Sequence, residues 1–405
     1  MDKAQELFKE FPPAVRQELD RWWNLLSDEQ KAETARVVEM LKPLVQGKVG
    51  LIRDLLRLME DQYTPLLFPR SRIAIVGPVN AGKTTLFNQF MEKKEDKGKV
   101  SPVPGTTREI RQAEAGFWQV VDTPGADHGT NVGDEEKMKA LDAAAQADFI
   151  IALFDASHGV TASGRELYKE ILAARKPHVV ALNKIDLVKK DLKEIIADTA
   201  KALGLQEEQI CAVSAAKGEN MGSLVSAIVK ADSRVLHSMG RVMPQYRHML
   251  AQRWILGASS SAGVIGLTPI PFVDLIPLTA LQCAMVLNVA SIYGYKITFA
   301  RAKELIATFG AGIAARTLFE QLSKLGGIPG WILAAAIASA TTAAIGFTAE
   351  KWFEKGEKVS AATFSRMAKK LTDEIIPRLT SLGKKKPDKE KLEKAITRAL
   401  EEGGD

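Results

Sequence analysis

The chain has 405 residues, of which 46% are hydrophobic, so it is long and apolar enough for two domains or for one domain with large extensions. Its formal net charge of +6 permits an anionic partner, such as nucleic acid or lipid, without requiring one. Cys211 and Cys283 are the only cysteines, which excludes a disulfide framework and zinc-type cysteine spacing.

The first region, residues 1–67, is expected to be helical. Residues 13–65 are predicted to form two helices, the second of which starts at the capping-box pattern of residues 27–30. An apolar stripe on that helix needs a packing partner, and we expect the C-terminal helices to supply it. The stripe comprises Val37, Leu41, Leu44, Leu51, Leu55 and Leu58. Residues 1–6 are polar, so no secretory signal segment is expected, and the reducing cytoplasm is the expected location.

A phosphate-binding loop is predicted at residues 77–85. They fit the pattern G-x-x-x-x-G-K-[ST], follow the apolar run of residues 73–76 and precede an expected helix at residues 86–90. Glycines in such a loop let several backbone N–H groups point at one anion, and the helix N-terminus adds partial positive charge. Lys83 is expected to reach the β- and γ-phosphates of a nucleotide, and Thr84 to hold Mg²⁺.

Four more motifs follow in an order that one parallel sheet explains, at residues 105–108, 122–125, 183–186 and 214–218. Each lies at the end of an apolar run or in the loop beyond one, where an open parallel sheet binds its ligand. Asp122 is expected to meet Mg²⁺ through water. The Gly125 N–H is expected to approach the γ-phosphate, and Thr107 to close on Mg²⁺ when that phosphate is present.

Asp186 is predicted to choose the base. Its two oxygens can accept from N1–H and the exocyclic amino group of guanine, whereas adenine offers no donor at either place. Asn183 and Lys184 are expected to frame the base, and the backbone of Ser214 and Ala215 to contact its carbonyl oxygen.

The five motifs together resemble the Era-like branch of the translation-factor-related GTPases, the group of the TrmE, Era and EngA families, over about residues 70–232. The resemblance implies GTP and GDP binding, Mg²⁺ dependence and slow hydrolysis by an α/β P-loop GTPase domain. This domain has three layers and a mostly parallel sheet, and we assign it to residues 68–232. The predicted nucleotide contacts are Gly77, Asn80, Ala81, Gly82, Lys83, Thr84, Thr85, Asp122, Gly125, Asn183, Lys184, Asp186, Ser214, Ala215 and Ala216. Catalysis is assigned to Lys83, Thr107 and Gly125, and Mg²⁺ to Thr84, Thr107 and Asp122.

The source of catalytic assistance differs from that of the small signalling GTPases. Ala126 follows Gly125, where those proteins have a glutamine that orients the attacking water. Help must then come from a partner, a second protomer or an ion. In TrmE-like proteins an asparagine at the position of Asn80 helps to bind K⁺, so the resemblance implies K⁺-stimulated hydrolysis. The alternative is that Asn80 is a turn-former that tolerates an unusual dihedral angle.

The C-terminal region, residues 233–405, is expected to form an all-α domain with the N-terminal flank. Residues 254–273, 275–295 and 325–349 carry no charge, and each stretch is close to the roughly 20 residues that span a bilayer. They form either a buried hairpin in a soluble domain or a segment that contacts a membrane. Glycines, serines and prolines weaken the first stretch as a helix. An amphipathic last helix is predicted at about residues 388–402.

Residues 269–282 resemble the apolar helical domain of unknown function that is fused to Era-like G domains, as in the YcjF group. The leading hypothesis is a nucleotide-dependent switch coupled to this domain, cytoplasmic and peripheral at the inner face of a membrane. Its expected partners are GTP and GDP, a membrane lipid or membrane protein, and a second copy of the chain. A self-assembling mechanochemical GTPase of dynamin or immunity-related type is one alternative. A ribosome- or RNA-assembly GTPase is another, but no RNA-binding module supports a nucleic-acid partner.

Overall fold

The protein is described by a computed structural model over residues 72–91, 107–108, 118–123, 147–267, 275–323, 327–383 and 385–403, together with residues 16, 20, 62, 64–66 and 70. Gly125 and Ala126 lie outside these residues, as does most of the predicted pair of helices within residues 13–65. The side chains of Thr107 and Asp122 also lie outside the description, whereas their backbone lies within it.

A five-stranded sheet in the order β3-β1-β4-β5-β6 forms the centre of the N-terminal half, and all of its described pairs are parallel. Its strands are β1 (Ile73–Pro78), β3 (Trp118–Thr123), β4 (Phe149–Asp155), β5 (His178–Asn183) and β6 (Ile210–Ala212). Helices α5 (Lys83–Met91), α7 (Ala162–Ala173), α8 (Leu192–Leu203) and α9 (Met221–Ala231) lie between or after the strands. Short 3-10 turns occur at η2 (Ile185–Leu187) and η3 (Glu207–Gln209).

Alternate side chains of each strand enter different cores, as the two-residue period of a β-strand requires. Ile73 and Ile75 pack with α5 and α9 on one face, whereas Ala74 and Val76 pack with α7 and α8 on the other. The sheet is therefore the middle of three layers, and its strands are apolar on both faces, as is usual for parallel sheets. The predicted α/β fold class is confirmed.

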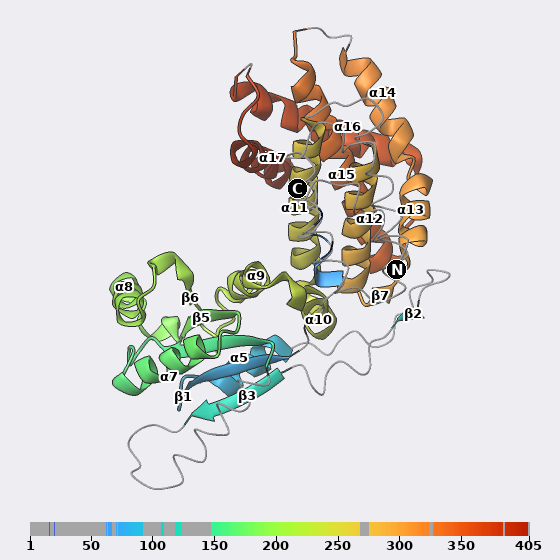
Figure 1. Cartoon of the computed structure of the whole chain (residues 1–405). Coiled ribbons are helices and arrows are strands. Elements are labelled where there is room, and N and C mark those ends of the chain that lie inside the picture. The colour runs from blue at the N-terminus through green and yellow to red at the C-terminus, as the bar shows by residue number, and fades with distance from the viewer. Residues whose placement is uncertain are drawn as a thin grey trace.

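The C-terminal half is helical (Figure 1). It begins with η4 (Ser233–Val235), α10 (Leu236–Val242) and η5 (Pro244–Tyr246). The long helices are α11 (Arg247–Gly266), α12 (Leu275–Ile292), α13 (Phe299–Thr308), α14 (Ala311–Ser323), α15 (Gly330–Lys355), α16 (Ala361–Ser381) and α17 (Lys389–Gly403). The predicted amphipathic last helix corresponds to α17, whose Leu392, Ile396 and Leu400 are buried.

Helix α11 corrects the expectation that small residues weaken the first uncharged stretch as a helix. It continues through Gly257, Ser259 and Gly263 without interruption. Small side chains here permit close packing of α11 on α15: a Cβ on Gly346 of α15 would lie 2.6 Å from Ile255 Cγ1 of α11. The packing contacts offset the low helix propensity of these residues, because propensity is a weak preference that tertiary context overrides.

Among the described helices, α15 alone is long and apolar enough to cross a membrane, yet 89% of its most apolar window is buried inside the protein. Trp352 and Phe353, near its end, are also buried and pack against other aromatic rings. These two aromatic side chains therefore belong to the core of the helical half. The burial of α15 fits the interpretation of a buried apolar helix better than that of a lipid-facing one.

The two halves are joined at the amino-terminal end of β1 and at the last turn of α5. Ser238 Oγ of α10 donates to the Arg70 carbonyl at 2.8 Å, and Arg70 forms a 3.0 Å ion pair with Asp232. Gln245 Nε2 donates to the Phe90 carbonyl at 2.9 Å. Because these contacts lie at the amino-terminal edge of the sheet, the carboxyl edge faces away from the helical half (Figure 1).

A buried polar cluster ties α10 to α12. Asn288 Nδ2 donates to the carbonyls of Ala284 at 2.9 Å and Gln62 at 2.8 Å, so its Oδ1 is left to accept from His237 Nε2 at 2.7 Å. Burial lowers the pKa of His237 to about 4, so the ring is neutral near pH 7. The bond to Gln62 brings the N-terminal flank against α12, which favours the predicted packing of both chain ends in one domain.

Candidate functional site

The loop between β1 and α5 is shaped to hold an anion. Lys83 begins α5 and is 3% exposed, and its Nζ donates to the carbonyls of Gly77 at 2.7 Å and Pro78 at 2.6 Å. Asn80 has a φ of 62°, in the left-handed region that asparagine tolerates. Thr84 and Thr85 are exposed in the first turn of α5. The amino end of this helix therefore faces solvent beside a buried lysine.

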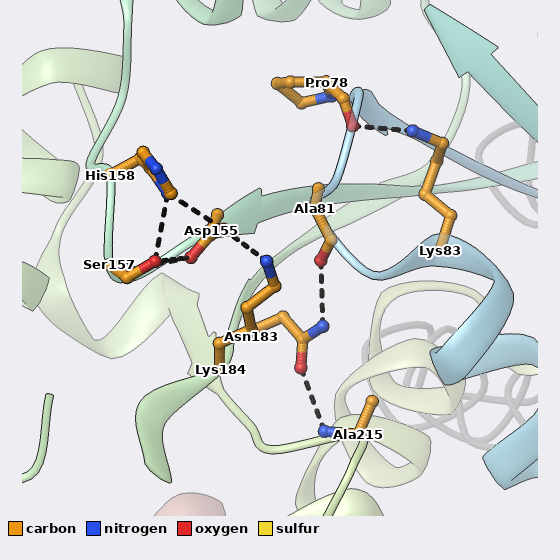
Figure 2. A network of polar contacts seen from close by, with 9 residues as sticks. All are labelled: Pro78, Ala81, Lys83, Asp155, Ser157, His158, Asn183, Lys184 and Ala215. Atoms are coloured by element: carbon orange, nitrogen blue, oxygen red, sulfur yellow. Dashed lines mark hydrogen bonds and ion pairs between the residues drawn. The ribbon is translucent and has the colours of Figure 1, made fainter. Parts of the chain in front are cut away.

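Asn183 at the end of β5 connects the loop to a second segment (Figure 2). Its Nδ2 donates to the Ala81 carbonyl at 2.9 Å, and its Oδ1 accepts from the Ala215 N–H at 2.9 Å. Gly82 has a φ of 90°, and a Cβ there would lie 2.3 Å from Asn183 Nδ2. No residue with a side chain fits that position. The predicted motifs at residues 77–85, 183–186 and 214–218 are thus brought together by one buried amide.

Lys184 is held by a carboxylate that the sequence analysis did not single out. Its Nζ donates to Asp155 Oδ2 at 2.6 Å, and the Ser157 N–H and hydroxyl donate to Asp155 Oδ1 at 2.8 and 2.6 Å (Figure 2). Burial opposes ionisation of Asp155, but the bonds from Lys184 and Ser157 hold the pKa of this carboxyl below its usual value. Asp155 is the last residue of the buried strand β4. Its position at the carboxyl edge of the sheet is the sequence signal that could have predicted its place in the site.

Asp186 lies in η2, and Ser214 Oγ donates to its Oδ1 at 2.6 Å. This bond fixes the carboxylate while Oδ2 keeps its accepting capacity. The backbone N–H groups of Ser214 and Ala215, which were expected to meet the base carbonyl, donate instead to Glu219 O and Asn183 Oδ1. Ala216, the third predicted residue of this segment, is exposed.

The predicted Mg²⁺ ligands are only partly assembled. Asp122 lies on β3 opposite Gly77, so its backbone is beside the phosphate loop, and Thr84 is exposed at the start of α5. A hydroxyl and a carboxylate are hard oxygen donors that suit Mg²⁺. Thr107 lies elsewhere: it is in β2 (Thr107–Arg108), which pairs antiparallel with β7 (Tyr295–Lys296) of the helical half. Gly125 lies outside the described residues.

Comparisons with known proteins agree with this division of the chain. Residues 72–184 match the family model described as 50S ribosome-binding GTPase, and residues 232–377 match the model of a domain of unknown function, DUF697. The chain is similar to the tRNA modification GTPase MnmE of Thermotoga petrophila, with 29% identity over 55% of this chain and 46% of the relative. It is 32% identical to the GTPase Der of Acetivibrio thermocellus over 40% of this chain and 37% of the relative.

The chain thus spans less than half the length of these two curated relatives. Among solved structures, a variant of Era from Aquifex aeolicus bound to GDP.AlF4⁻ matches with 26% identity and a TM-score of 0.31, over 50% of this chain and 69% of that chain. The predicted pairing of an Era-like domain with an apolar helical domain is confirmed by the two family models. The chain therefore joins a P-loop GTPase domain of the 50S ribosome-binding GTPase family to a DUF697 domain.

Proposed function

We propose that this protein binds GTP and GDP together with Mg²⁺ and hydrolyses GTP to GDP and phosphate. The observation that carries the proposal is the Asn183 amide, which links the phosphate loop at Ala81 to the base-side segment at Ala215. Phosphates would lie at the amino end of α5, with Lys83 turned from its loop carbonyls to the phosphate oxygens. Mg²⁺, held by Thr84 and Asp122, would neutralise charge on the β- and γ-phosphates. The base would lie against Lys184 and Asp186.

Replacing Lys83 with alanine is expected to weaken GTP and GDP binding by roughly 10- to 100-fold. The buried ammonium supplies charge-assisted hydrogen bonds, each worth about 1.5–3 kcal/mol. Isothermal titration calorimetry on purified protein measures the loss. Lys201→Ala, an exposed lysine on α8, is the matched control and should bind as the wild type does. Unchanged affinity in Lys83→Ala would refute the assignment of the phosphate loop.

We further propose that the nucleotide state is passed to the helical half through the β2·β7 pair. Thr107 is the residue assigned to close on Mg²⁺, yet it pairs with Lys296. The joint between the halves lies at the amino-terminal edge of the sheet, whereas the phosphate loop lies at the carboxyl edge. Thr107 cannot occupy both places, so closing on Mg²⁺ requires it to leave β7. Such a competition makes β2·β7 pairing and GTP binding mutually opposed.

Potassium is our proposal for the missing catalytic group. The left-handed φ of Asn80 accounts for asparagine in the turn, and Asn80 is exposed at the loop. Replacing Na⁺ with K⁺ is expected to raise GTP turnover at least about tenfold, as a cation at the transferred phosphate stabilises its developing charge. Steady-state phosphate release measures the rate. Asn80→Gly keeps the backbone conformation and removes the ligand, so the stimulation should disappear there. Equal rates of the wild type in both salts would end the idea.

We place this activity in the cytoplasm, with the helical half at the inner face of a membrane or on a membrane protein. The burial of α15 supports peripheral contact over a spanning helix. A nucleotide-dependent homodimer is the other arrangement that would supply a catalytic group in trans. Self-assembly on lipid would identify the mechanochemical type instead, and salt-sensitive RNA binding would identify an RNA-assembly factor.

A further inference from the structure

A cavity of about 660 Å³ opens in the helical half between α11, α15 and α16. Its volume lies within the range of roughly 300–1,000 Å³ that small-molecule sites occupy. Phe347, Met367 and Leu371 give it an apolar part. It is separate from the nucleotide site, because it lies wholly within helices of the DUF697 domain, whereas the phosphate loop follows β1.

One buried acid, Glu350, lines the cavity and is hydrogen-bonded by two residues of the protein. Glu350 is 4% exposed, and its Oε1 accepts from the Tyr293 hydroxyl at 3.0 Å and from His248 Nδ1 at 2.9 Å. Burial raises the pKa of this carboxyl, and the two donors oppose the rise. Because two donors of the protein already bind the Glu350 carboxylate, it does not require a bound cation as a further partner.

The rim has the opposite charge. Lys351 and Lys355 lie one turn apart on α15, and Arg366 and Lys370 lie one turn apart on the facing helix α16. Glu354 is the one further carboxylate among the residues that line the cavity. Lys370 forms a 3.8 Å ion pair with Glu374 of the same helix, so Lys351, Lys355 and Arg366 supply most of the positive charge at the opening. Cations on both helices at one opening attract an anion, and the planar guanidinium of Arg366 suits phosphate in particular.

We propose that this cavity binds a phosphate-bearing amphiphile. Its phosphate would lie between Lys351 of α15 and Arg366 of α16, and its apolar chain would lie against Phe347, Met367 and Leu371. A free phosphate ester and a lipid of a bilayer share this chemistry. Met249, which follows His248 in the chain and is not part of the cavity lining, accepts a hydrogen bond at its sulfur from Ser226 Oγ of α9 at 3.9 Å.

The test uses isothermal titration calorimetry with hexyl phosphate, a soluble amphiphile, on full-length protein that carries Lys83→Ala. That background weakens the phosphate loop as a competing anion site, and binding in the cavity does not depend on GTPase activity. Inorganic phosphate and hexanol are the comparison ligands, each with half of the expected chemistry. We expect hexyl phosphate to bind at least about tenfold more tightly than either, because both ends of the ligand contribute.

The double variant Lys351→Ala with Arg366→Ala removes one exposed cation from each helix and should weaken hexyl phosphate binding about tenfold. Lys358→Ala with Lys369→Ala removes the same charge from exposed positions outside the cavity and should leave binding unchanged. Circular dichroism melting checks that both variants fold. Equal binding of hexyl phosphate and inorganic phosphate, or an equal loss in the control variant, would overturn the proposal.

Vesicles of phosphatidylcholine with phosphatidic acid separate the two sources of the ligand. Sedimentation with these vesicles that is lost in the Lys351→Ala, Arg366→Ala variant identifies a lipid headgroup. Binding of hexyl phosphate without sedimentation identifies a soluble ester. Both results support the proposed site. Vesicle binding that the double variant leaves intact would assign the lipid contact to another surface of the protein. If the protein also failed to bind hexyl phosphate, the proposed site would be refuted.

Discussion

Asp186→Asn is expected to reverse the nucleotide preference from GTP to xanthosine triphosphate by a factor of about 10⁴, which is the scale at which sites built on paired hydrogen bonds reject a wrong ligand. In the proposed complex the carboxylate of Asp186 would accept from two donors on guanine. An amide in its place offers a donor, which suits the carbonyl group that xanthine carries where guanine has its amino group. Competition binding of GTP, ATP and xanthosine triphosphate, each against labelled GDP, measures the change.

Two companion variants make this experiment specific. Asp191→Asn removes an exposed acid five residues away and should leave guanine preference intact. Ser214→Ala removes the hydroxyl that donates to Asp186 Oδ1 at 2.6 Å. It should weaken guanine binding by the worth of one hydrogen bond to a charged group, about 1.5–3 kcal/mol, without creating affinity for xanthine. Unchanged guanine preference in Asp186→Asn would remove that residue from the base site.

The parts of the site that sequence could predict are those in which local pattern determines geometry. The loop around Lys83 follows an apolar strand and starts a helix, so its shape depends on neighbours in the chain. The contacts that sequence did not reveal are tertiary. Asp155 becomes a partner of Lys184 only because β4 and β5 are adjacent in the sheet. The Ala215 N–H donates to Asn183 because β5 and β6 are adjacent, and no spacing within either motif signals this contact.

In the helical half, amino-acid composition alone likewise does not predict how the helices pack. An uncharged stretch with glycine and serine is compatible with a loop, a lipid-facing helix or a buried helix, since composition does not identify the neighbour. In the structure α11 and α15 pack against each other, and Ile255 of α11 lies against Gly346 of α15. Helix formation and burial therefore arise together from the pairing. The antiparallel contact of Thr107 with Lys296 likewise joins residues that no local pattern connects.

A disulfide between Arg108→Cys and Tyr295→Cys, which leaves the Thr107 hydroxyl in place, is expected to slow GTP hydrolysis reversibly. These residues are partners in the antiparallel pair, where Cα atoms lie about 4.5–5.5 Å apart, within the span of roughly 4.4–6.8 Å that a disulfide bridges. The bond at the next residue holds Thr107 at β7, so Thr107 cannot close on Mg²⁺. Turnover should fall by roughly 10²- to 10³-fold, the usual cost of losing a group that stabilises the transition state. GDP affinity should change little, because Lys83 and Asp186 are untouched.

Reduction distinguishes the effect of the disulfide from damage to the fold, since dithiothreitol should restore turnover in the same sample. Each single cysteine variant is carried as a control, because Cys211 and Cys283 remain in the chain and Cys211 is half-buried. The competition has a second consequence: a non-hydrolysable GTP analogue with Mg²⁺ should slow formation of the cross-link, whereas GDP should not. Full turnover in the oxidised double variant would show that hydrolysis does not require Thr107 to leave β7, and the proposed route from nucleotide to helical domain would fail while the nucleotide site itself would stand.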